Sequence, residues 1–138
     1  MSCSILINEL QHAIEKEFNH VLRKQNTTMS QARVLSILLE SQEKQITLKE
    51  LERKLKLAQS VTAGLVKRLE EKHHIESFGS ASDKRIKIVK ITPEGEKQCR
   101  NTQATFMKLE KKFLVHLNDD DVELFKSFLK QALQTFQD

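Results

Sequence analysis

Two groups of residues near the middle of the chain have side chains suited to binding a polyanion. The first lies between residues 59 and 67, combines small and polar side chains with one cation, and comprises Gln59, Ser60, Ala63 and Lys67. The second is the adjacent pair Lys84 and Arg85, which Asp83 precedes. Short polar side chains can approach base edges, and long cations reach phosphates or a minor groove. The two groups can act on one ligand only if the fold brings them to one surface.

The segment before the first group begins with a signal for a helix N-terminus. Thr47 and Glu50 are three residues apart. The Thr47 hydroxyl can therefore accept from the Glu50 N–H while the Glu50 carboxylate reaches back, as in a capping box. Leucines then recur at helical spacing through Leu55. Apart from Leu57, residues 57–60 are small or polar. This composition predicts a short turn.

A second helix is predicted after this turn. Its expected inward face comprises Val61, Leu65, Val66 and Leu69. At about 100° per residue, the group formed by Gln59, Ser60, Ala63 and Lys67 falls on the opposite face. Glycine in a helix interior lowers helix stability by about 1 kcal/mol relative to alanine. The presence of Gly64 is consistent with another group packing closely against this helix. The alternative is an ordinary amphipathic surface helix.

A β-hairpin is predicted next, with Lys84 and Arg85 at or near its tip. Residues 75–78 form a short strand, residues 79–83 have turn chemistry, and the second strand contains Ile86, Ile88 and Ile91, with Lys87 and Lys90 pointing outward. We expect Asp83 to position Arg85 through a charge-assisted hydrogen bond. The alternative is a solvated turn whose ion pair contributes about 0–1 kcal/mol.

The charge distribution supports this assignment. Residues 47–92 contain eleven Lys or Arg against six Asp or Glu, a net charge of +5, whereas the whole chain carries +4. All of the excess positive charge therefore lies in the two helices and the hairpin, as expected of a surface that binds nucleic acid.

These motifs, in this order, resemble the multiple-antibiotic-resistance-regulator (MarR) family of winged-helix transcription regulators. The resemblance spans nearly the whole chain. The matching features are Thr47-x-x-Glu50-Leu51, Ser60-Val61-Thr62, Val66-x-x-Leu69-Glu70, Ile75, Asp83-x-Arg85 and Ile91-Thr92-x-x-Gly95.

The resemblance implies a homodimeric regulator, most often a repressor, that binds a pseudo-palindromic operator in double-stranded DNA. A small ligand, typically an aromatic acid, or an oxidant would release the DNA. By position, the recognition-helix contacts would be Gln59, Ser60, Thr62, Ala63 and Lys67. Arg85 would be the minor-groove residue, supported by Asp83.

Three positions depart from the family pattern. Ala58 stands where a capping Ser or Asp is usual, and His73-His74 stands where a Gly usually ends the recognition helix. Ser77 stands where Arg is frequent, so a phosphate contact at the base of the hairpin is not expected.

Both ends of the chain are predicted amphipathic helices. The N-terminal stripe comprises Ile7, Leu10, Ile14, Phe18 and Val21, and the C-terminal stripe comprises Val122, Phe125, Phe128, Leu129, Ala132 and Phe136. We expect these stripes to pair with those of a second copy; the alternative is a monomeric bundle. Further capping signals occur at Thr28 with Gln31, at Thr92 before Pro93, and at Asn118 before three aspartates.

The predicted fold is mainly α, a winged helix-turn-helix core with a small β-hairpin wing, flanked by N- and C-terminal dimerisation helices. Its 138 residues predict one domain, 1–138, with the core at about 30–92 and dimerisation helices at about 1–25 and 93–138. The apolar segment 34–39 should be central to the core.

Other functions find little support in the sequence. No signal peptide, membrane span, phosphate loop, metal-ligand motif or catalytic constellation is evident, so we expect a cytoplasmic protein that is not an enzyme and needs no cofactor. The cysteines are Cys3 and Cys99, and we interpret Cys99 as buried and inert. Two alternatives stay open: a redox-sensing regulator that uses Cys99 or Cys3, and a winged-helix module that binds protein rather than DNA.

Overall fold

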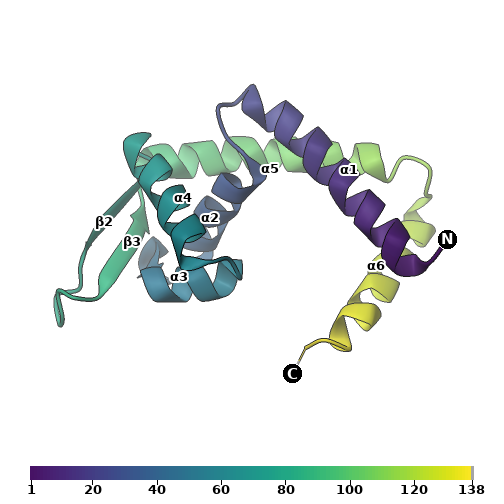
Figure 1. The fold of residues 1–138 in the computed structure, drawn as a ribbon. Coiled ribbons are helices and arrows are strands. Elements are labelled where there is room, and N and C mark those ends of the chain that lie inside the picture. The colour runs from purple at the N-terminus through teal and green to yellow at the C-terminus, as the bar shows by residue number, and fades with distance from the viewer. Residues whose placement is uncertain (138) are drawn as a thin grey trace. The chain divides into compact units, whose positions relative to one another are not determined.

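The computed structural model describes residues 1–137, which form helices and a small antiparallel sheet (Figure 1). In chain order the elements are α1 (Cys3–Arg23), α2 (Met29–Glu40), the 3-10 helix η1 (Gln42–Lys44), β1 (Gln45–Thr47), α3 (Leu48–Leu55), α4 (Gln59–Glu71), β2 (Ile75–Gly79), β3 (Lys87–Ile91), α5 (Pro93–Phe113) and α6 (Asp119–Gln134). The predicted mainly helical fold with a β-hairpin wing is confirmed. Residues 1–105 form one compact unit, and a second begins at Phe106.

The core of the first unit surrounds α2, as the apolar segment predicts. Val34, Leu35 and Leu38 of α2 are fully buried. Around them pack buried side chains from α3, α4, the sheet and α5, namely Leu51, Leu55, Val66, Leu69, Ile75, Val89, Ile91 and Cys99. Complete burial of a Leu or Val side chain contributes about 1.5–3 kcal/mol. This cluster therefore fixes the inner faces of α3 and α4.

The sheet has the strand order β1-β3-β2, with both pairs antiparallel. In the short strand β1, Ile46 pairs with Val89 of β3. The predicted placement of Ile86 in the second strand is wrong, because Ile86 precedes β3 and is exposed, whereas Val89 and Ile91 face the core. Val89 and Ile91 are two residues apart and therefore share the buried face of the pleated strand.

Side chains cap the predicted helix N-termini. The Thr47 hydroxyl accepts from the Glu50 N–H at 3.1 Å, and the Thr28 hydroxyl accepts from the Gln31 N–H at 3.2 Å. The Thr92 hydroxyl accepts from the Gly95 N–H at 3.0 Å, and Asn118 Oδ1 accepts from the Asp121 N–H at 2.8 Å. The reciprocal halves of the two predicted capping boxes have other partners. The Glu50 carboxylate accepts from Arg53, and the Gln31 side chain accepts from Lys72 Nζ at 2.6 Å.

The C-terminus of α4 ends without glycine by using His73 in the left-handed region, with φ of 62°. The His74 N–H donates to the Leu69 carbonyl at 3.0 Å, and the His73 N–H donates to the Glu70 carbonyl at 3.0 Å. This pair of bonds is a Schellman motif, which satisfies carbonyls left over at a helix end. The missing glycine noted in the sequence is thus replaced by a strained histidine.

The start of α5 packs directly on this helix end. Thr92 N–H donates to the His74 carbonyl at 3.0 Å, and Thr92 Oγ1 donates to the His73 carbonyl at 2.6 Å. A Cβ added to Gly95 would lie 2.0 Å from the His74 carbonyl oxygen. Only glycine therefore allows α5 to approach the end of α4 this closely.

The predicted apolar stripes of the terminal helices are exposed toward the two ends of the chain and partly buried elsewhere. In α1, Ile7 is 54% exposed, although Phe18 near the other end of the helix is buried. In the second unit, Phe128 and Phe136 of the C-terminal segment are 57% and 85% exposed. Exposed apolar surface of this kind marks an interaction face.

We predict that His73→Gly stabilises the fold by about 0.5–1 kcal/mol, because glycine adopts the left-handed region without the steric penalty of a Cβ. Urea denaturation measures this free energy of unfolding. His74→Gly is the matched control, because His74 is not in the left-handed region, and it should destabilise. A destabilisation by both substitutions would contradict this account of the helix end.

Candidate nucleic-acid interface

The turn between α3 and α4 sets the direction of α4. Lys56 adopts the left-handed region with φ of 55°, and its N–H donates to the Glu52 carbonyl at 3.0 Å. The Arg33 guanidinium of α2 donates to the carbonyls of Lys54 and Leu55 at 3.2 and 3.4 Å, which satisfies the exposed end of α3. Ala58 caps α4 without a side-chain hydrogen bond, as the sequence indicates. The α3–turn–α4 segment is therefore a helix-turn-helix.

The outward face of α4 carries most of the predicted contact residues. Exposed side chains belong to Gln59, Ser60, Ala63 and Lys67, as predicted. The exposure of two neighbouring side chains is the reverse of the prediction. Val61 was expected inside and is 50% exposed, whereas Thr62 is fully buried and does not lie on the contact face.

The spacing of the core residues explains this reversal. Thr62, Val66 and Leu69 are the buried residues of α4 and form an i, i+4, i+7 stripe. Val61 is turned about 100° away from Thr62. The Oγ1 atom of Thr62 is buried and has no hydrogen-bond partner among the described residues.

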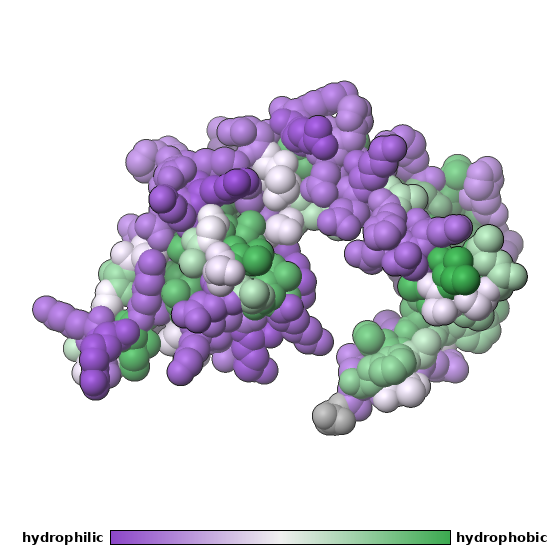
Figure 2. Space-filling model, in the orientation of Figure 1, coloured by the Kyte–Doolittle hydropathy of each residue, from purple (hydrophilic) through white to green (hydrophobic). Residues whose placement is uncertain are grey.

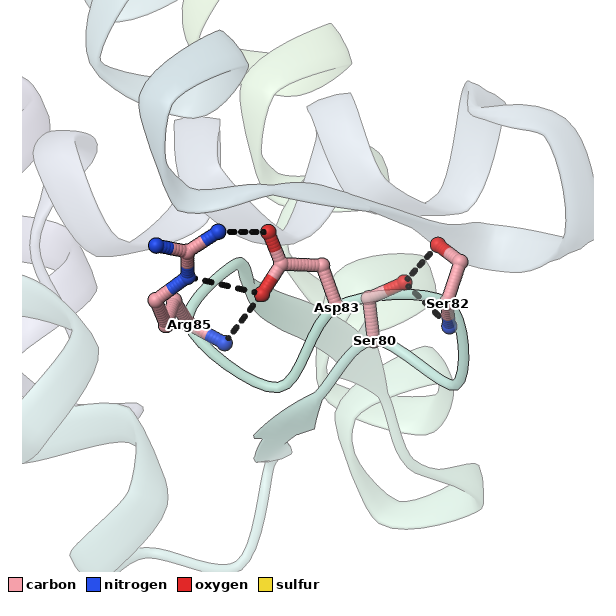
Figure 3. A network of polar contacts seen from close by, with 4 residues as sticks. All are labelled: Ser80, Ser82, Asp83 and Arg85. Carbon is pink, nitrogen blue, oxygen red and sulfur yellow. Dashed lines mark hydrogen bonds and ion pairs between the residues drawn. The ribbon is translucent and has the colours of Figure 1, made fainter.

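The wing tip holds Arg85 as predicted (Figure 3). The Nε and Nη2 atoms of Arg85 donate to the two carboxylate oxygens of Asp83 at 3.1 and 3.2 Å, and the Arg85 backbone N–H adds a bond of 3.0 Å. The side-chain bonds and then the backbone bond lower the pKa of Asp83. The Arg85 side chain remains 91% exposed, so it is oriented yet available to a ligand.

Local contacts also shape the loop behind Arg85. Ser80 Oγ accepts from the Ser82 N–H at 3.3 Å and lies 3.0 Å from Ser82 Oγ (Figure 3). A Cβ on Gly79 would lie 2.9 Å from the Lys84 carbonyl oxygen, so glycine lets the two sides of the loop approach. Lys84 and Arg85 are both exposed in this loop.

Glu70 connects α4 to both strands of the wing, which the sequence reading missed. Ser77 Oγ of β2 donates to Glu70 Oε1 at 2.7 Å, and Lys87 Nζ of β3 lies 3.7 Å from the same oxygen. Ser77 therefore has an internal partner, and the expected lack of a phosphate contact at this residue stays a prediction. The only sequence signal was the position of Glu70 in the motif Val66-x-x-Leu69-Glu70.

Comparison with known proteins agrees with this geometry. The MarR family model matches residues 27–87, which run from the start of α2 into the wing. The HTH-type transcriptional regulator YwoH of Bacillus subtilis strain 168 is 30% identical over 128 residues, which cover 93% of this chain and 91% of YwoH. This chain belongs to the MarR family. It is a transcription regulator of that family.

Solved structures of other regulators share the fold. The Escherichia coli MarR C80S mutant complexed with operator DNA is 25% identical, with a TM-score of 0.84, over 94% of this chain and 92% of that chain. The Staphylococcus aureus MepR–DNA complex is 22% identical, with a TM-score of 0.87, over 98% of each chain. The likeness to MepR shows the fold alone.

The cysteines of this MarR-family chain have contrasting environments. Cys99 is 1% exposed, and burial raises the pKa of its thiol. The reactive thiolate is therefore disfavoured, which agrees with an inert, structural Cys99. Cys3 is exposed at the first turn of α1.

Residues 1–137 contain no cluster of three or more His, Cys, Asp or Glu side chains placed to hold a metal ion. Among the same residues, no helix has the length and apolar character needed to cross a membrane.

Proposed function

We propose that this MarR-family regulator binds double-stranded DNA sequence-specifically and acts as a homodimeric repressor. The outward face of α4 enters the major groove, and the wing tip reaches the adjacent minor groove or backbone. The observation that carries the proposal is the Asp83–Arg85 pair, because it holds an almost fully exposed guanidinium in one orientation at the wing tip.

The DNA-contacting set consists of Gln59, Ser60, Ala63 and Lys67 on α4, together with Lys84 and Arg85, with Asp83 as the positioning residue. The buried stripe of α4 holds this face outward, and Glu70 holds the wing against the same helix. Both contact elements therefore belong to one rigid unit and need little ordering on binding. The likeness to the Escherichia coli MarR mutant that was solved with operator DNA supports DNA binding by this chain.

The apolar faces of α1 and α6 support a homodimer. Exposed apolar side chains occur on α1 at Ile5, Leu6 and Ile7 and on α6 at Leu124, Phe128 and Leu133. Burial of these faces against a second copy would remove them from water. A two-fold axis then places two recognition helices at half-sites about 34–36 Å apart, one turn of DNA. We place the dimer in the cytoplasm, with no catalytic activity.

We predict that Arg85→Ala weakens binding to a specific duplex by about 1–3 kcal/mol, roughly 5- to 150-fold. Fluorescence anisotropy at physiological salt measures the affinity. Asp83→Asn should cause a smaller loss, because it frees Arg85 without removing its charge.

Lys130→Ala is the matched control, because it removes an exposed cation from α6, outside the winged-helix core. It should leave the affinity within about twofold. Equal affinities for Arg85→Ala and Lys130→Ala would remove Arg85 from the interface.

We predict a dimer of twice the 16.0 kDa chain mass at micromolar concentration, measured by sedimentation equilibrium. Phe128→Asp should shift the mass to that of a monomer, because it places a charge in the proposed apolar interface. Ser127→Asp introduces the same charge at the neighbouring exposed position and should preserve the dimer. A wild-type monomer at this concentration would exclude the homodimer.

A further inference from the structure

Gly64 is a glycine that the fold itself does not require. It lies in the interior of α4, where glycine is less favourable than alanine. A Cβ added there meets no atom within 4 Å, and none of the chain's glycines has a positive φ. Neither crowding nor backbone conformation within the chain therefore explains the residue.

Close backbone contacts within the chain explain the other two glycines. A Cβ on Gly79 would lie 2.9 Å from a backbone oxygen, and one on Gly95 would lie 2.0 Å from another. Gly64 differs from both, because the space beside it is open. The absence of a side chain at Gly64 therefore permits the close approach of another molecule.

The position of Gly64 identifies the surface involved. At about 100° per residue, it lies nearly opposite the buried stripe of Thr62, Val66 and Leu69. It is therefore central on the exposed face of α4. The exposed Val61 lies one turn earlier, so an apolar side chain borders Gly64 on one side. The exposed Ser60, Lys67 and Arg68 border it one turn away along the helix. Figure 2 shows pale and green surface in the region of α3 and α4, bordered by hydrophilic side chains.

We propose that Gly64 lets the backbone of α4 lie directly against base edges in the major groove, and that this approach brings Val61 against a thymine methyl group. The proposal rests on the DNA-binding function above and specifies how the sequence is read. Thymine is distinguished in the major groove by its 5-methyl group, which apolar side chains contact. An added methyl at position 64 would hold the helix away from the bases.

The exposed face of α4 supports this mode of recognition. The side chains on this face that can form paired hydrogen bonds with a base edge include Gln59 at the first helical position and the exposed Arg68, one turn after Gly64. Lys67 carries a single ammonium group, which suits a phosphate or one acceptor. Apolar contact by Val61 and the close fit at Gly64 add discrimination to these hydrogen bonds, with A·T pairs favoured opposite Val61.

The test compares the stability and DNA affinity of Gly64→Ala. The probe is a duplex selected from a random pool by the wild-type full-length protein. The substitution should raise the unfolding midpoint by about 2–4 °C, because the Cβ has room and the unfolded chain loses entropy. The affinity for the selected duplex should fall tenfold or more.

Asn101→Ala is the matched control, since it replaces an exposed polar residue in α5 by a better helix former. It should leave the affinity unchanged. Gly64→Ala with unchanged affinity would overturn the proposal. Failure of the wild-type protein to select any duplex would instead overturn the DNA-binding function itself, and the present proposal with it.

A second arm identifies the methyl group. Each thymine of the half-site is replaced in turn by deoxyuridine, which removes the methyl and retains every hydrogen-bonding group. At least one replacement should weaken wild-type binding by about three- to tenfold. The same replacement should have no further effect on Val61→Ala. Binding that is insensitive to every replacement would overturn the methyl contact.

Discussion

Burial of one stripe of α4 is the constraint on which the rest of the structure depends. Thr62, Val66 and Leu69 lie in the core around α2 and leave little freedom to rotate the helix. The opposite face is thereby committed to solvent, with its small, polar and weakly apolar residues. A rotation of the helix by about 100° would bury Val61 instead and present Thr62. The core therefore selects the chemistry that the recognition helix offers to DNA.

Contacts at the two ends of α4 fix the neighbouring elements relative to this helix. At the N-terminal side, Arg33 of α2 satisfies the end of α3 and fixes the turn. At the C-terminal side, the His74 carbonyl accepts from Thr92 and lies close to Gly95. Glu70 adds the connection to the wing strands. Recognition helix and wing thus behave as one unit, which limits the entropy lost on binding.

Local features were predictable from sequence because their partners are near in the chain. The caps at Thr28, Thr47, Thr92 and Asn118 and the Asp83–Arg85 pair each join residues within three positions. Long-range pairings were not predictable. Gln31 looked like half of a capping box, yet it binds Lys72, 41 residues away. Likewise, helical periodicity located α4 but not its rotation, which only the core settles.

Specific DNA binding by the positive helix-and-wing surface of residues 47–92 is the central property to test. The most direct measurement is the affinity for duplex fragments from upstream of the protein's own gene over a range of salt. We expect a steep fall of affinity with salt and one fragment preferred by about 10³-fold or more. A weak affinity that salt does not change would contradict this expectation and favour a module that binds protein.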